Sequence, residues 1–165
     1  MEQKFIIAVY VDNQAGVLTR VTSMFTRRNF NIDTLTVGET ERKEYSRITI
    51  SMSGDECAKE QLVNQLKKLY VVKKVEVLEV EPIKRELMLI KVENKAEHRS
   101  DIMTAVDVFR ASVIDYSPDG MCIEVTGNPS KIDAFVKLMQ PFGILEMCRT
   151  GVVALDRGNN TLFND

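Results

Sequence analysis

The order of strands and helices predicted along the chain repeats once, and this repeat limits the fold more than any other sequence feature. Residues 5–11 form an apolar run of strand length, and from Val17 onward apolar residues recur on one helical face. Strands over 30–37 and 46–53, a second helix, and a strand over 71–80 follow. The predicted order of elements in the first half of the chain is therefore strand, helix, strand, strand, helix, strand.

The second half repeats this order after a proline-containing segment, 81–84. The expected elements are strand 86–92, a helix carrying Ile102, Ala105, Val106 and Phe109, strands 112–116 and 121–126, a helix begun by Asn128-Pro129, and strand 144–155. We therefore expect an α+β chain of two tandem ferredoxin-like βαββαβ domains. Their expected bounds are 1–80 and 85–158, with a linker over 81–84 and a frayed polar tail over 159–165.

A βαββαβ unit has two helices on one face of its sheet, so its other face needs a cover. In the first unit that face includes Ile6, Ala8 and Tyr10 or their neighbours. Packing between the two domains or pairing of edge strands between two chains would provide the cover. Of these, we favour a homodimer.

Charge and cysteine content exclude several classes of partner. The net charge is −2 and the isoelectric point is near 5.6, which argues against nucleic acid or an anionic membrane. The three cysteines are far apart and lack metal-binding spacing, so we expect neither disulfides nor a metal site. No apolar run reaches the length of a membrane helix and no targeting segment is evident, so we expect a cytoplasmic protein.

The stretch from Val11 to Thr19 joins the first strand to the first helix and is the strongest candidate for a binding site. Free N–H groups at a helix start bind anions, and Gly16 lets an anion approach without a Cβ in the way. The Asn13 amide offers a donor and an acceptor, which suits an amino acid. The alternative is that Asp12 or Asn13 caps the helix and that Gly16 merely eases the turn.

Side chains for catalysis are scarce. The single histidine, His98, lies among charged residues at a predicted helix start, and no phosphate-binding glycine loop occurs. Cys57 has no predicted catalytic partner nearby in the sequence. A binding module is favoured over an enzyme, and we expect no catalytic residue.

Several stretches resemble one protein family. Asp12-Asn-Gln-Ala-Gly-Val-Leu-Thr-Arg20, with Arg28-Asn-Phe-Asn-Ile32 and Leu35-Thr-Val37, resembles the ACT domain of the regulatory small subunit of acetohydroxyacid synthase, also called acetolactate synthase. Stretches in the second half resemble the second domain of the same subunit: Arg85-Glu-Leu-Met-Leu-Ile-Lys-Val92, Val108-Phe-Arg-Ala-Ser-Val-Ile-Asp115 and Arg149-Thr-Gly-Val-Val-Ala-Leu-Asp-Arg-Gly158.

The resemblance implies a non-catalytic protein that activates a catalytic large subunit and confers feedback inhibition by a branched-chain amino acid, commonly valine. Thiamine diphosphate, magnesium and FAD would bind to the large subunit and not to this chain. The resemblance further implies a homodimer that binds the effector between its two chains. The effector-binding residues would be Asn13, Ala15, Gly16, Val17 and Leu18 of one chain and Asn31 and Ile32 of the other.

Two features depart from the family pattern. Cys148 and Asp156 flank the last motif where small or neutral residues are more usual, which affects nothing essential. The family usually has glycine where this chain has Asn29. Asparagine tolerates a positive φ better than most residues, so we expect the turn to be kept.

Other functions stay open. An ACT-type amino-acid sensor could regulate a different enzyme, and a transcriptional regulator is disfavoured because no helix-turn-helix or basic segment accompanies the first domain. An enzyme that uses His98 or Cys57 is a distant third.

Overall fold

The computed structural model describes residues 3–163, and they fall into two units. Residues 3–83 and 151–163 form the first unit, and residues 84–150 form the second. The predicted fold class, two βαββαβ units in tandem, is confirmed. The ends of the chain before residue 3 and after residue 163 lie outside the described residues.

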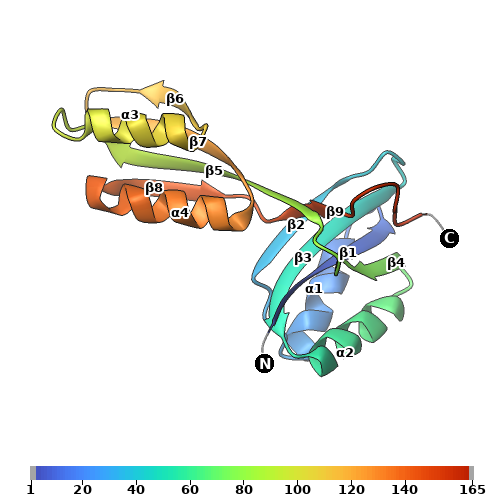
Figure 1. The fold of residues 1–165 in the computed structure, drawn as a ribbon. Coiled ribbons are helices and arrows are strands. Elements are labelled where there is room, and N and C mark those ends of the chain that lie inside the picture. The colour runs from blue at the N-terminus through green and yellow to red at the C-terminus, as the bar shows by residue number, and fades with distance from the viewer. Residues whose placement is uncertain (1–2, 164–165) are drawn as a thin grey trace. The chain divides into compact units, whose positions relative to one another are not determined.

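The first unit is a four-stranded antiparallel sheet with two helices on one face (Figure 1). Its strands pair in the order β2-β3-β1-β4. The elements are β1 (Gln3–Asp12), α1 (Val17–Arg27), β2 (Thr34–Glu39), β3 (Tyr45–Gly54), α2 (Glu56–Lys67) and β4 (Val72–Val77).

The two faces of β1 are both apolar, which explains its continuous apolar run. Ile7, Val9 and Val11 point into a core that Phe25 of α1 and Leu66 of α2 complete. Ile6, Ala8 and Tyr10 alternate with them and lie in a separate cluster on the other face. The strand is thus buried on both sides.

Local sequence signals set the ends of the helices. The Asp55 carboxylate accepts a hydrogen bond from the Ala58 amide at 2.8 Å and caps α2. Asn29 follows α1 with a φ of 56°, and the Phe30 amide donates to the Phe25 carbonyl, which closes the helix in a Schellman motif. The prediction that Asn29 keeps the left-handed turn is confirmed.

The strand that follows this turn begins later than predicted. β2 starts at Thr34 and not at residue 30. Asn31 and Ile32 therefore lie in the connection between α1 and β2, because the helix end turns the chain before it can join the sheet.

The second unit repeats the arrangement. Its strands pair in the order β6-β7-β5-β8, and Asn128 caps its last helix through the Lys131 amide at 2.9 Å. The elements are β5 (Ile83–Glu93), α3 (Arg99–Val108), β6 (Ser112–Tyr116), β7 (Gly120–Gly127), α4 (Pro129–Met139), the short 3-10 helix η1 (Gln140–Phe142) and β8 (Ile144–Arg149).

The C-terminal segment differs from the prediction. The expected strand 144–155 is two strands, β8 in the second unit and β9 (Val153–Leu155) in the first. Residues 151–158 thus belong with the first unit and not with the second domain. The break lies at Gly151, where a Cβ would stand 2.4 Å from Thr36 Oγ1 and 2.8 Å from the Leu35 carbonyl oxygen.

The expected frayed tail is packed onto the first sheet as far as residue 163. Leu162 is only 4% exposed and joins Val152 and Ala154 against the outer face of β1. Phe163 lies edge-on to the Tyr10 ring with 4.2 Å between their centroids. Residues 164 and 165 of the predicted tail lie outside the described residues.

Polar side chains of the first sheet hold the backbone of this segment. Thr36 Oγ1 donates to the Val152 carbonyl at 3.1 Å, and Arg47 Nη2 donates to the Ala154 carbonyl at 2.7 Å. The chain therefore covers Ile6, Ala8 and Tyr10 with its own C-terminal segment. Covering this face therefore does not require a homodimer.

Gly151→Ala tests this packing. The added Cβ would collide with β2 backbone, so we expect the C-terminal segment to shift and the first unit to lose about 1–3 kcal/mol of stability. Gly38→Ala in β2 is the matched control, because nothing lies within 4 Å of a Cβ there. Denaturant unfolding and amide exchange of Ile6 and Ala8 give the measurement. Equal stability of the two variants would show that the close approach is unimportant.

Candidate functional site

The connection between β1 and α1 presents an open helix start. Gly16 precedes α1 with a φ of 84°, a left-handed conformation that favours glycine. Nothing lies within 4 Å of the position of a Cβ on Gly16. A ligand can therefore approach the backbone here.

No side chain among the described residues caps the start of α1, whereas α2 and α4 are capped by Asp55 and Asn128. The Asp12 carboxylate instead lies 3.1 Å from Lys73 Nζ, and Asn13 Nδ2 donates to the Lys43 carbonyl at 3.0 Å. The capping alternative of the sequence analysis is therefore wrong. The helix start keeps its partial positive charge for another acceptor.

Backbone hydrogen bonds hold this connection in place from both sides. The Asp12 amide donates to the Val71 carbonyl at 2.9 Å, and the Asn13 amide donates to the Glu44 carbonyl at 2.8 Å. These bonds tie the connection to the residue just before β4 and to the turn between β2 and β3. The Asn13 side chain is restrained by its own bond to the Lys43 carbonyl, which lowers the entropy cost of ordering it on binding.

The apolar residues of the connection divide into two groups. Val17 is 5% exposed and belongs to the core, so only its backbone could reach a ligand. Its amide lies 3.5 Å from the Gln14 carbonyl, which is a long hydrogen bond. Leu18 is 41% exposed, and Ala15 is exposed as well. Leu18 is therefore the side chain in this half that can receive an aliphatic group.

The other predicted residues lie beyond the far end of α1. Asn31 is exposed, and its Nδ2 lies 3.4 Å from Asp33 Oδ1, a weak contact. Ile32 is half-buried and packs partly against the core. The side chain of Asp33 in turn accepts a hydrogen bond from Ser53 at 2.9 Å.

One chain does not bring the two sets of residues together. α1 spans 11 residues between Gly16 and Asn31, which corresponds to about 16 Å. A single amino acid is too small to touch both ends of that helix. The predicted residues therefore lie in two separate groups, one at each end of α1.

Arg47 is a structural side chain of the first unit that the sequence analysis did not single out. It holds the C-terminal segment against β3. One sequence feature could have indicated this role. Arg47, Thr49 and Ser51 alternate with Ile48 and Ile50, so they form a polar face of β3 that another segment can contact.

The catalytic candidates remain isolated among the described residues. His98 Nε2 lies 3.6 Å from Glu97 Oε1 and its ring faces Phe142, while Cys57 is an exposed free thiol on α2. Residues 3–163 contain no group of three or more His, Cys, Asp or Glu side chains that could hold a metal ion. Within the same residues, every helix falls short of the length and apolar character needed to span a bilayer.

Comparisons with known proteins point to one family. The family model described as AHAS small subunit-like ACT domain matches residues 7–74, and the model described as small subunit of acetolactate synthase matches residues 85–158. A probable acetolactate synthase small subunit of Archaeoglobus fulgidus is 47% identical over 156 residues, which cover 94% of this chain and 98% of that protein.

Further relatives agree in sequence and structure. The acetolactate synthase small subunit of Mycobacterium bovis is 46% identical over 153 residues, which cover 92% of this chain and 91% of that protein. The crystal structure of an acetolactate synthase small subunit from Thermotoga maritima superposes with a TM-score of 0.89 at 38% identity, covering 96% of this chain and 99% of that one.

Proposed function

Because the chain belongs to the family of acetolactate synthase small subunits, we propose that it regulates the catalytic large subunit of that enzyme. In this proposal the chain binds the large subunit, raises its activity, and makes the enzyme sensitive to feedback inhibition by a branched-chain amino acid. Valine is the effector that we favour. Thiamine diphosphate, magnesium and FAD bind to the large subunit, where the reaction takes place.

The observation that carries the effector-binding role is the uncapped, glycine-led start of α1 in the ACT domain. The N–H groups of the first turn are placed to bind the effector carboxylate, and Gly16 leaves the space that it needs. The restrained Asn13 amide is within the same connection and can complete the polar contacts.

The remaining contacts come from a second chain. A homodimer places Asn31 and Ile32 of one protomer against Gly16 and Leu18 of the other, because one protomer holds these residues at opposite ends of α1. Leu18 and Ile32 then enclose the aliphatic side chain, and Asn31 binds the ammonium or the carboxylate. Dimerisation is therefore a condition of effector binding.

The direct test is reconstitution of the enzyme. Acetolactate production by a purified large subunit is measured alone, with this chain, and with this chain plus valine, leucine or isoleucine. We expect stimulation by the chain and inhibition by at least one of the three amino acids. Lack of stimulation would favour an ACT-type sensor of a different enzyme.

Asn31→Ala tests the second half-site. Asn31 is exposed and makes only a weak side-chain contact within its own chain, so we expect the variant to fold as the wild type does. Loss of hydrogen bonds to a charged ligand group should weaken effector binding by about tenfold, corresponding to about 1.5 kcal/mol. Calorimetric titration measures the affinity, and wild-type affinity would remove Asn31 from the site.

A further inference from the structure

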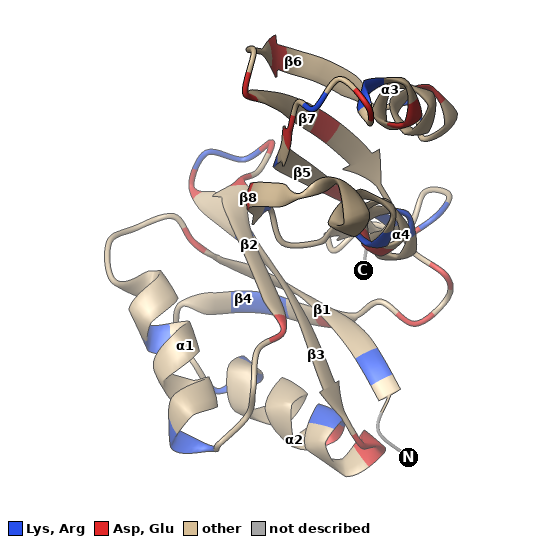
Figure 2. Cartoon of the chain, turned by 90° about the vertical axis from the view of Figure 1, so that its left-hand side faces the viewer, with Lys and Arg blue, Asp and Glu red and all other residues tan. Residues whose placement is uncertain are grey.

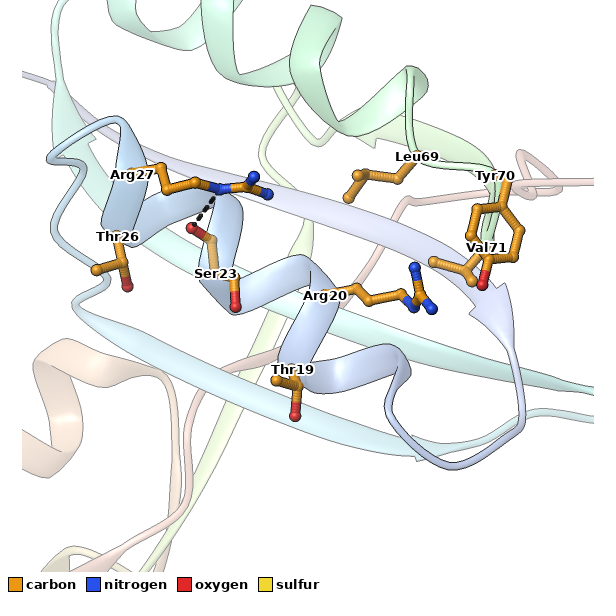
Figure 3. Close-up of a pocket in the computed structure, with 8 residues that line it drawn as sticks. All are labelled: Thr19, Arg20, Ser23, Thr26, Arg27, Leu69, Tyr70 and Val71. Atoms are coloured by element: carbon orange, nitrogen blue, oxygen red, sulfur yellow. Dashed lines mark hydrogen bonds between the residues drawn. The ribbon is translucent and has the colours of Figure 1, made fainter.

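A groove on the first unit lies apart from the effector-binding residues. It has a volume of about 600 Å³ and runs between α1 and the connection from α2 to β4 (Figure 3). We call it the Arg20 groove. Its lining consists of Thr19, Arg20, Ser23, Thr26, Arg27, Leu69, Tyr70 and Val71.

The charged side chains that line the Arg20 groove are all positive. Arg20 and Arg27 are its charged lining residues, and neither is matched by an acidic residue in the lining. The whole of α1 lacks aspartate and glutamate, so Figure 2 shows blue bands and no red on this helix. Three hydroxyl side chains of α1 add hydrogen-bonding groups along the same face.

Each arginine has a contact that holds its side chain along the groove. The Arg20 guanidinium lies over the Tyr70 ring, 4.9 Å from its centroid, and Arg27 Nε donates to the Ser23 carbonyl at 3.4 Å. Val71 is 1% exposed and Leu69 is half-buried, whereas Tyr70 is 67% exposed. A charge held over apolar side chains is less screened than one in open water.

The Arg20 groove lies on a different side of α1 from the side chain assigned to the effector. Leu18 and Arg20 are two residues apart on a helix of about 3.6 residues per turn, so they point to nearly opposite sides of α1. The effector contacts assigned above use the Leu18 side. The proposed effector contacts therefore do not account for the groove on the Arg20 side of α1.

We propose that the Arg20 groove docks an acidic segment of the catalytic large subunit. Its carboxylates pair with Arg20 and Arg27, and an apolar side chain between them packs on Tyr70 and Leu69. This inference rests on the proposed regulatory function, because it names the surface through which the chain reaches its catalytic partner.

The residue types favour a protein partner. Arginine and tyrosine are enriched among the residues that dominate binding energy at protein interfaces, and arginine binds carboxylates with two parallel hydrogen bonds. Two arginines are too few for a nucleic-acid or membrane surface on a chain with a net charge of −2. The groove also lies on the helix that begins at the effector-binding glycine, so effector binding at Gly16 could bias docking through α1.

The test compares two double variants with the same change of net charge. The groove variant carries Arg20→Glu and Arg27→Glu, which reverse the charge of the groove. The control variant carries Lys4→Glu and Lys137→Glu, which reverse the charge of two exposed lysines outside the groove. Stimulation of the large subunit is measured against the concentration of each variant. We expect the groove variant to need at least about tenfold more protein for half-maximal stimulation, and the control less than about twofold.

Two further measurements make the result specific. Raising the salt concentration should weaken stimulation by the wild type more than by the groove variant, because charge pairing is screened. A photocrosslinking residue at Thr19 should attach to a peptide of the large subunit that contains aspartate or glutamate. Calorimetric titration with valine should show the same affinity for the wild type and the groove variant, which also shows that the variant is folded.

The outcomes are separable. If the wild type stimulates the large subunit and the groove variant does so equally well, the docking proposal is overturned while the proposed function stands. Crosslinks only to a second copy of this chain would also overturn it. If the wild type fails to stimulate the large subunit, the proposed function fails and the docking proposal fails with it.

Discussion

Replacing Gly16 by aspartate should abolish feedback inhibition while leaving stimulation of the large subunit largely intact. The new carboxylate would occupy the space at the start of α1 that we assign to the effector carboxylate. Like charges brought together at a binding site cost several kcal/mol, so we expect the effector affinity to fall at least about 100-fold. Calorimetry and the concentration of valine that halves acetolactate production give the measurement.

The Gly16→Asp variant should still fold. An acidic residue at a helix start interacts favourably with the helix dipole, and no neighbouring atom is close enough to clash with the added Cβ. The main cost is the left-handed φ of 84°, about 1–2 kcal/mol for a residue other than glycine.

Gly158→Asp is a matched control for that cost. Gly158 also has a positive φ, 73°, and also has nothing within 4 Å of a Cβ. It lies in the C-terminal segment, outside the effector-binding residues. Equal loss of inhibition in the two variants would mean that backbone strain or added charge, and not the effector carboxylate, explains the effect.

Mixing two defective chains tests whether the site is shared. Gly16→Asp chains and Asn31→Ala chains each lack a different half-site. After random exchange between symmetric dimers, about a quarter of all sites combine an intact Gly16 with an intact Asn31 of the partner. Recovery of high-affinity binding in the mixture supports a shared site, whereas a site within one chain predicts no recovery.

Removing the charge of Arg149 should strongly destabilise the second unit. Glu86 is 4% exposed, and its Oε2 lies 2.5 Å from Arg149 Nη2. Burial lowers the pKa of Arg149, but its hydrogen bonds to Glu86 and Asp133 outweigh this effect and raise it. The hydrogen bonds therefore favour the charged guanidinium.

Arg149→Met would leave the Glu86 carboxylate buried without its counter-charge. Breaking such a pair costs about 3–5 kcal/mol. Adding Glu86→Leu to this variant should restore most of the loss, because both charged groups are then gone. Since two units need not unfold together, amide exchange in β5 and β8 measures the stability of this unit directly.

Asp133→Asn is the control on the same guanidinium. Asp133 lies 2.8 Å from Arg149 Nη1, but its side chain is 58% exposed, so its ion pair is worth about 1 kcal/mol or less. A loss as large as that of Arg149→Met would contradict the view that burial of Glu86 causes the effect.

Local signals explain why much of the fold was predictable. The caps at Asp55 and Asn128 depend on a side chain and an amide three residues away. The left-handed turn at Asn29 depends on one residue type at the end of one helix. Apolar periodicity likewise extends over single elements, so the order of the elements could be predicted segment by segment.

Long-range contacts explain why the path of the C-terminal segment was not predictable. Its polar residues after 156 resemble a frayed end, but Leu162 and Phe163 reach the outer face of β1. Thr36 binds the Val152 carbonyl across 116 positions of the sequence. Such a contact depends on the position of the whole sheet, and no local pattern indicates it.

The sequence by itself determined the repeated βαββαβ order and the helix ends, because short-range hydrogen bonds and periodic burial set them. Only the tertiary structure decided that Asp12 and Asn13 leave the helix start uncapped, and that Leu18 is exposed whereas its neighbour Val17 is buried. It also decided that Tyr70 lies beneath Arg20. These features depend on which segments meet in space, and that is set by the packing of the core as a whole.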